Sequence, residues 1–138
     1  MKIVLDTNVV VSALLQPLGP SGQILAAVLA GEHQACFDDR IMEEYVEVLA
    51  RPRFGFDQLQ VEVVLDQIKA EGLRASCTPL NAALPDPDDE QFLEVAAGAQ
   101  AEYVITGNLR DYPEDRRQGI RVVSPREFLT LTTKTQQG

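Results

Sequence analysis

The stretch that decides the fold is Met1–Ser12, which reads MKIVLDTNVVVS. Its apolar run from Ile3 to Leu5 is short and continuous, which is typical of a strand buried on both faces in a parallel sheet. The run ends at Asp6, and Thr7 and Asn8 follow as residues that commonly begin helices. Asp6 is therefore expected at the carboxyl edge of a sheet, where open α/β folds bind their ligands. An isolated Asp at such a position is more often only a helix cap, so a functional role requires other acids at the same edge.

The 138 residues predict one domain, over residues 1–131, with a frayed tail at 132–138. The composition is that of an ordinary globular protein, with 45% hydrophobic residues. No apolar run approaches the roughly 20 residues that span a bilayer, and the chain begins on a strand rather than a signal peptide. Cys36 and Cys77 lack metal-type spacing, so we expect free thiols in a reducing cytoplasm and no membrane association.

The formal net charge is −9, which argues against broad electrostatic attraction to nucleic acid or to an anionic membrane. Nucleic acid remains a possible substrate if metal ions and a local basic patch supply the attraction. Basic residues do gather late in the chain, at Arg110, Arg116, Arg117, Arg121 and Arg126.

The rest of the chain alternates between short apolar strands and one-sided helices. Further strands are expected at residues 34–37, 74–78, 103–105 and 121–123. Helices are expected at residues 9–15, 21–30, 39–50, 61–71 and 86–99, and a last helix opens at 124–125. This alternation predicts a three-layer α/β/α sandwich with a central parallel sheet of four to five strands.

Two of the predicted helices carry an acid on the side that faces the core. Glu44 lies three residues after Ile41 and four before Val48, so it follows the apolar stripe of its helix, whereas Glu43 lies on the wet face. Because burying an unpaired carboxylate is costly, Glu44 requires a partner or a function, unless it reaches solvent from the edge of the stripe.

The second of these acids lies in the segment DPDDEQFL at residues 86–93. Asp86 followed by Pro87 is a strong helix-start signal, which makes Asp86 the expected N-cap. Asp89 shares the inward side of the first turn, and a role in binding is favoured over capping; Asp88 fits either role. Four acids in five residues repel one another, and a bound cation would offset that repulsion.

A second strand, at residues 103–105, also ends on small polar residues, Thr106, Gly107 and Asn108. Strand-to-helix turns of a parallel sheet open on one edge, so this turn is expected beside Asp6, with Glu44 and Asp89 leaning over both. Oxygen ligands without His or Cys favour Mg²⁺ or Mn²⁺. Acids around such a cation suit the hydrolysis of phosphodiester bonds. The lone His33 has no metal-ligand companions and is expected in a loop or at the surface.

Four motifs, taken together, resemble those of the PIN-domain nucleases, particularly the toxin components of bacterial toxin–antitoxin pairs. They are VLDTNVVVSAL at residues 4–14, EY at 44–45 followed by VLARPRF at 48–54, DPDDEQFLEVA at 86–96, and AEYVITGN at 101–108. The resemblance covers nearly the whole chain. It implies a single α/β/α domain that binds Mg²⁺ or Mn²⁺, cleaves RNA, often forms a homodimer, and is neutralised by a small antitoxin.

By motif, the resemblance makes Asp6, Glu44 and Asp89 the catalytic and metal-binding acids, with Thr7 and Asn8 in support. One position departs from the family pattern, because Asn108 stands where many PIN domains have Asp after Thr-Gly. An amide oxygen binds a cation less strongly than a carboxylate, so one of two metal positions would be weak, with Asp111 as a partial substitute. Thr106 either orients water at the metal or is only a strand-end hydroxyl.

The leading prediction is therefore a metal-dependent endoribonuclease of the cytoplasm. A second prediction, favoured by Asn108 and the acidic surface, is a PIN-type module that has lost efficient catalysis and binds RNA or protein. A third, an aspartyl phosphohydrolase, requires a second acid shortly after Asp6 and a well-placed lysine. Asn8 occupies that position and lysines are scarce, so this reaction is disfavoured.

Overall fold

The computed structural model describes residues 1–137, which form a five-stranded, all-parallel sheet with helices on both sides. The strands follow the order β3-β2-β1-β4-β5, so β1 is central. The strands are β1 (Lys2–Leu5), β2 (Gln34–Phe37), β3 (Leu73–Arg74), β4 (Tyr103–Ile105) and β5 (Val122–Val123). The α-helices are α1 (Thr7–Leu15), α2 (Pro20–Leu29), α3 (Asp39–Leu49), α4 (Gln58–Glu71), α5 (Glu90–Ala99) and α6 (Pro125–Gln137). Short 3₁₀ turns are η1 (Pro52–Phe54), η2 (Pro87–Asp89), η3 (Leu109–Asp111) and η4 (Glu114–Arg116).

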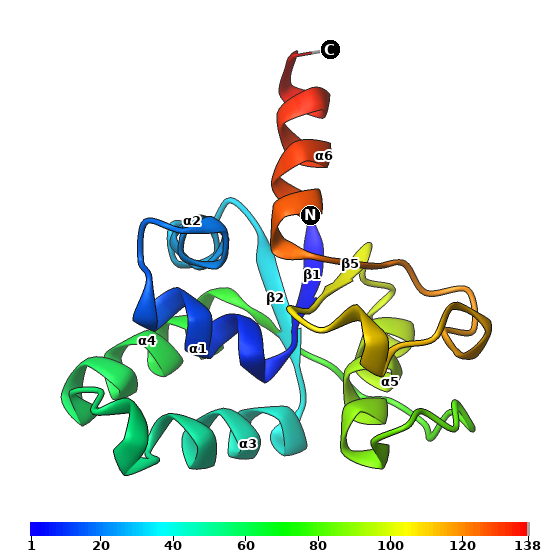
Figure 1. The fold of residues 1–138 in the computed structure, drawn as a ribbon, viewed down its shortest axis with the longest axis horizontal. Helices are drawn as coiled ribbons and strands as arrows, with labels where there is room; N and C mark the ends of the chain where they lie inside the picture. The colour runs from blue at the N-terminus through cyan, green and yellow to red at the C-terminus, as the bar shows by residue number, and fades with distance from the viewer. Residues whose placement is uncertain (138) are drawn as a thin grey trace.

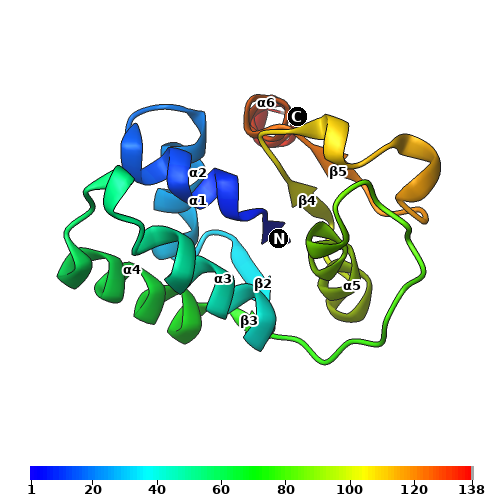
Figure 2. The ribbon, with the colours of Figure 1, turned by 60° about the horizontal axis from the view of Figure 1, so that its bottom comes forward.

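The layers follow from the crossover connections. Helix α5 contacts β1, β2 and β4 on one side of the sheet, and Figure 2 shows α1, α2 and α4 on the other side. Helix α6 packs against α2 and projects away from the body of the molecule (Figure 1). The predicted three-layer α/β/α sandwich is confirmed.

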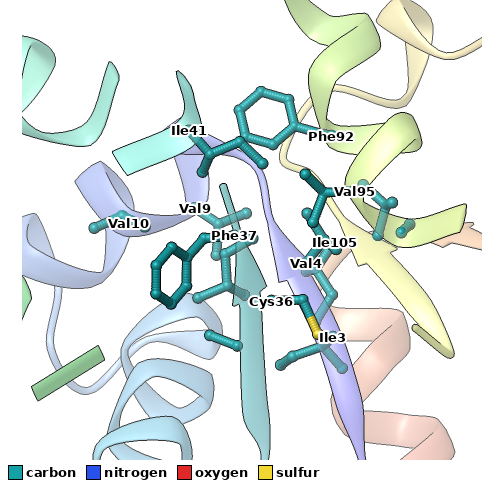
Figure 3. Close-up of a cluster of buried hydrophobic side chains, with 14 of the residues drawn as sticks. Ile3, Val4, Val9, Val10, Cys36, Phe37, Ile41, Phe92, Val95 and Ile105 are labelled. Atoms are coloured by element: carbon teal, nitrogen blue, oxygen red, sulfur yellow. The ribbon is translucent and has the colours of Figure 1, made fainter. Parts of the chain in front are cut away.

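The core lies on both faces of the central strands. Ile3 and Val4 of β1, Cys36 and Phe37 of β2 and Ile105 of β4 are all buried. Figure 3 shows their side chains between those of α1 and those of α5. This two-sided burial explains why the strands read as continuous apolar runs rather than alternating ones. It also leaves the strand ends as the places where polar side chains emerge.

Three local predictions differ from the structure. The strand expected at residues 74–78 is only β3, because after Ala75 donates to the carbonyl of Phe37 the chain leaves the sheet. The helix expected from residue 86 begins as the 3₁₀ turn η2 and becomes α-helical at Glu90. Helix α6 continues to Gln137 through most of the predicted tail, and Gly138 lies outside the described residues.

Among the described residues, no single helix is long and apolar enough to cross a membrane. Helices α1 and α2 meet that measure only as a pair, with a bend of 101° between them.

Candidate functional site

Asp6 occupies the N-cap position of α1 at the end of the central strand, and it is 5% exposed. Its Oδ2 accepts two hydrogen bonds, one from the Thr106 hydroxyl at 3.0 Å and one from the Tyr112 hydroxyl at 2.9 Å. Burial raises the pKa of Asp6, while the hydroxyls of Tyr112 and Thr106 partly oppose that rise. Asp6 is therefore a buried carboxylate with one oxygen fixed by two donors from the neighbouring strand end and loop.

Glu44 lies on α3, which is tied to β1 because the hydroxyl of the adjacent Tyr45 donates to the carbonyl of Leu5. The Thr7 hydroxyl at the start of α1 donates to Oε2 of Glu44. Glu44 is half-buried, and Glu43 is exposed as predicted. Burial raises the pKa of Glu44, and the charges of Asp6, Asp88 and Asp86 raise it further.

Asp89 ends η2 at the N-terminus of α5, and its side chain makes no capping hydrogen bond there. Asp86 is the cap of η2, as predicted, because it accepts from the Asp88 amide at 2.9 Å. Burial raises the pKa of Asp89 to about 7, with further contributions from the charges of Asp6, Asp86, Asp111 and Glu44. These contributions mean that the three predicted acids, which come from three separate elements, lie within electrostatic reach of one another.

The turn after β4 closes this edge of the sheet. Thr106 is fully buried. Its hydroxyl donates to Asp6 and also accepts a hydrogen bond from the backbone N–H of Asn108 at 3.1 Å. Asn8 accepts from the Gly107 amide at 2.8 Å through its side-chain oxygen, and its Nδ2 donates to Thr106 at 3.4 Å. A Cβ at Gly107 would lie 3.3 Å from that same Asn8 oxygen, which favours glycine here. The turn is thus locked to the start of α1.

Asn108 uses its side-chain Nδ2 to donate to Asp111 at 3.0 Å. The side-chain amide of Asn108 therefore orients the carboxylate of Asp111, three residues further along the chain. Asp111 is half-buried, and its charge contributes to the raised pKa values of Asp89 and Tyr112.

A pocket of about 580 Å³ opens in front of these groups. Thr7, Asn8, Glu44 and Asp89 of the predicted set line it, while Asp6 is buried behind them. Asp86 and Asp88 also line it, together with residues of α1 and α3 and with Arg51, Arg53 and Phe54. Thr106, Asn108 and Asp111 lie outside this lining and reach the site through Asp6, Asn8 and one another.

The donor set fits a hard divalent cation. It consists of carboxylate, hydroxyl and amide oxygens, which Mg²⁺ and Mn²⁺ prefer, and the pocket lining contains no thiol or imidazole. A cation would also relieve the mutual repulsion that raises the pKa values of Glu44 and Asp89. Among the described residues, no group of three or more His, Cys, Asp or Glu side chains is arranged so that it could hold a metal ion. An open set of carboxylates suits Mg²⁺, which retains several waters and takes only a few protein ligands.

Tyr112 also belongs to the site, although it was not among the residues predicted from the sequence. It is completely buried, its hydroxyl contacts Asp6, and burial raises its pKa well above the usual range. Tyr112 lies in an irregular loop without apolar periodicity, so the sequence carries no signal that it turns inward.

The late arginines do not gather at the pocket. Arg116 donates to the Ala83 carbonyl at 2.6 Å, and Arg117 donates to the Tyr112 carbonyl at 2.8 Å, so both hold the chain in place. The guanidinium groups that line the pocket belong to Arg51 and Arg53 instead.

A parallel α/β domain with acids gathered at the carboxyl edge of its central strands is an arrangement that suits metal-assisted hydrolysis of phosphate esters. Residues 2–110 match the family model of the PIN domain, so the chain belongs to the PIN-domain family. PIN domains are generally nucleases that use divalent metal ions. No curated protein sequence matches the chain.

Two solved structures are similar in fold. One is VapBC2 from Rickettsia felis bound to a DNA fragment from their promoter, with a TM-score of 0.60 and 13% identity, covering 90% of this chain and 98% of that chain. The other is the PIN domain endonuclease Utp24, with a TM-score of 0.50 and 17% identity, covering 89% of this chain and 84% of that chain. At these identities the likeness concerns the fold.

Proposed function

We propose that this chain is a Mg²⁺- or Mn²⁺-dependent endoribonuclease that hydrolyses RNA phosphodiester bonds in the cytoplasm. The observation that carries the proposal is that Glu44 and Asp89, from two separate elements, line one pocket, with Asp6 buried behind them at the end of the central strand. Their carboxylates are costly to hold together without a cation, because each has a raised pKa. Such an arrangement is favoured when the charge is needed for binding a metal rather than for stability.

The bound cation would activate water and stabilise the charge that develops on the leaving oxygen. Asp6, Glu44 and Asp89 would hold the cation. A different contact or position orients each of these three side chains. Thr106 and Tyr112 both donate to Oδ2 of Asp6, and the backbone amides of Asn8 and Thr7 also contact its carboxylate, so the orientation of this acid is fixed. Thr7 orients Glu44 by donating to its Oε2. The carboxylate of Asp89 makes no capping hydrogen bond, because Asp86 supplies the cap of η2. Asn108 positions Asp111 at the rim as a weaker fourth oxygen donor.

We propose further that the chain is the toxin of a toxin–antitoxin pair, neutralised by a small antitoxin and acting as a homodimer. The fold shared with VapBC2 and the family motifs support this part of the proposal.

The test is cleavage of a mixed single-stranded RNA in Mn²⁺, Mg²⁺ or EDTA. Wild type is expected to cleave only with metal. Asp6→Asn and Asp89→Asn are expected to lose at least about 100-fold in rate, since even outer-shell partners of metal ligands cost 10–100-fold. Glu43→Gln on the exposed face of α3 is the matched control and retains wild-type activity. Equal rates for wild type and either Asp variant would contradict the assignment.

The second candidate, a binding module without efficient catalysis, is favoured by Asn108. Its amide is committed to Asp111 and cannot supply the charge of a fourth carboxylate. A folded, partner-free protein that cleaves with none of the metals would support this candidate. Cleavage gained in Asn108→Asp would then assign the missing activity to that position.

A further inference from the structure

The pocket has two chemically different ends. At the end nearest the sheet, Glu44 and the acids of residues 86–89 surround the start of α1. Arg51, Arg53 and Phe54 line it at the other end, where α3 passes into η1. Figure 1 shows α1 and α3 running in the same direction away from the sheet. The nine residues of α1 rise about 14 Å, so the two ends are separated by more than one phosphate spacing.

Arg51 lies two residues beyond the helix that carries Glu44. Glu44 and Val48 are one helical turn apart on α3, Arg51 follows the end of that helix at Leu49, and all three line the pocket. A ligand held by Glu44 through a metal would therefore have Arg51 ahead of it along the same wall.

Arg53 is held in place without being neutralised. Its guanidinium carbon lies 4.8 Å from the centroid of the Phe54 ring, and that ring stacks on Phe56 at 5.5 Å and 13°. Within residues 1–137, Arg53 pairs with no carboxylate, and Arg51 pairs only with Glu47, at 3.6 Å and with both side chains exposed. Exposed pairs of this kind contribute little. Both cationic groups are therefore available to a ligand, and stacking pre-organises the planar group of Arg53.

These arginines do not simply neutralise the neighbouring acids, because no ion pair joins them to Asp86, Asp88 or Asp89 among the described residues. A planar guanidinium suits bidentate contact with phosphate oxygens. In a chain of net charge −9, a phosphate backbone requires such local cations to approach the acids.

We propose that the Arg51–Phe56 segment is the subsite that binds the phosphodiester backbone of single-stranded RNA beside the cleavage position. Arg51 and Arg53 each contact one phosphate, and the Phe54–Phe56 stack holds Arg53 in its binding orientation. This inference rests on the proposed nuclease function, and it identifies where the substrate strand leaves the acids.

The test measures RNA binding without cleavage. Fluorescence anisotropy of a labelled 12-nucleotide single-stranded RNA is recorded in EDTA with the Asp89→Asn chain as the parent. Arg53→Ala in that parent is expected to raise Kd about tenfold, the loss of one charge-assisted contact. It should also reduce the slope of log K against log salt by about 0.7, the value for one phosphate on a single strand. Phe54→Leu is expected to give a smaller rise in Kd, because the charge remains but its support is lost.

Arg121→Ala is the matched control. Arg121 is also exposed and lies 6.0 Å from an aromatic centroid, that of Tyr103, but it precedes β5 at the opposite edge of the sheet. Its removal changes the net charge equally and is expected to change Kd less than twofold. A DNA strand of the same sequence should show the same losses, because the contact is to the backbone. Circular dichroism melting of each variant separates loss of binding from loss of folding.

Equal weakening by Arg53→Ala and Arg121→Ala, or an unchanged salt slope, would overturn the subsite. Arginine-dependent binding of a polyglutamate peptide without binding of RNA would also overturn it, since it would assign the surface to an acidic protein. Arginine-dependent RNA binding by a wild-type chain that cleaves with no metal would leave the subsite standing and refute the nuclease. Metal-dependent cleavage with an unchanged KM in Arg53→Ala would support the nuclease and refute the subsite.

Discussion

At the scale of single residues, the most constrained group is the carboxylate of Asp6. Two hydroxyls converge on its Oδ2, and no buried side-chain N or O atom among the described side chains lacks a hydrogen-bond partner. Because a hydrogen bond to the charged form favours ionisation, these donors counter the burial that raises the pKa of Asp6. Tyr112 is thus a positioning residue that keeps Asp6 ionised and oriented.

Tyr112→Phe tests this role. The variant removes one donor without creating a large cavity, so the pKa of Asp6 rises further and Mn²⁺ affinity at pH 7 falls about tenfold. The pH at which half of the metal is bound shifts upward, which isothermal titration at several pH values measures. Tyr103→Phe, whose hydroxyl makes no hydrogen bond in the described structure, is the control and should leave both quantities unchanged. If the pH dependence of Mn²⁺ binding is the same in Tyr112→Phe as in wild type, Tyr112 contributes only packing and does not tune Asp6.

Asp89 predicts a pH dependence of stability in the metal-free protein. Its folded-state pKa of about 7 lies above the ordinary value of 3.8, so stability from this group falls as pH rises from about 4 to about 7. Asp89→Asn removes the penalty. We expect its Tm to exceed that of wild type by roughly 2–4 °C at pH 8, for about 1 kcal/mol after allowance for the half-exposed carboxyl. The difference should vanish near pH 4, and a difference independent of pH would contradict this origin.

The acids could be predicted from the sequence because each has a local signal. Asp6 directly follows an apolar strand, Glu44 has the phase of the buried stripe, and Asp89 follows a cap and a proline. Tyr112 and the orientation of Asp111 could not be predicted, because they depend on how an irregular loop folds back over the sheet edge.

At the scale of elements, the site depends on the spacing between α3 and α5, which carry Glu44 and Asp89. An ion pair between a half-exposed arginine and a buried glutamate spans these helices. Nη1 of Arg40 lies 2.7 Å from Glu94, which is 7% exposed and also accepts from the Leu80 amide at 2.9 Å. Arg40 also contacts Asp38 at 2.8 Å, and Glu94 raises its pKa above the usual range. The pair joins both helices to the long loop at residues 75–86.

Arg40→Leu is expected to destabilise the fold by about 2 kcal/mol. Breaking a fully buried pair costs about 3–5 kcal/mol, and the estimate is reduced because the arginine is half exposed. Urea unfolding measures the change. Asp39→Asn, which breaks the exposed contact with Arg74, is the control and should stay within about 0.5 kcal/mol. A similar loss in both variants would show that burial of Glu94 is not the cause.

Element boundaries were predictable where apolar runs meet strong caps. Strands β2 and β4 match the predicted ranges, and Asp38 caps α3 by accepting from the Ile41 amide at 3.0 Å. The strand predicted at residues 74–78 was too long, because alternating residues there pack as a loop against α5. Gly98 lies so close that a Cβ would approach Ser76 O at 2.7 Å, a contact between distant segments that no local pattern encodes.

At the scale of the whole molecule, negative charge is excessive overall and concentrated at the site. The sequence gives the total of −9 and the late arginines, but the fold decides which cations reach the pocket. Arg51 and Arg53 do, while Arg121 lies at the opposite edge. The sheet order was equally beyond the sequence, although the parallel class and the shared carboxyl edge follow from the alternation of strands and helices.

Asp6, Glu44 and Asp89 are proposed to form one cation site, and titration of Mn²⁺ into the metal-free protein at pH 7.5 measures binding at that site. We expect a saturable site in wild type and in Glu43→Gln, with affinity reduced at least about 100-fold in both Asp6→Asn and Asp89→Asn. This result requires no knowledge of the RNA target. Mn²⁺ binding of equal strength in wild type and both Asp variants would contradict the account.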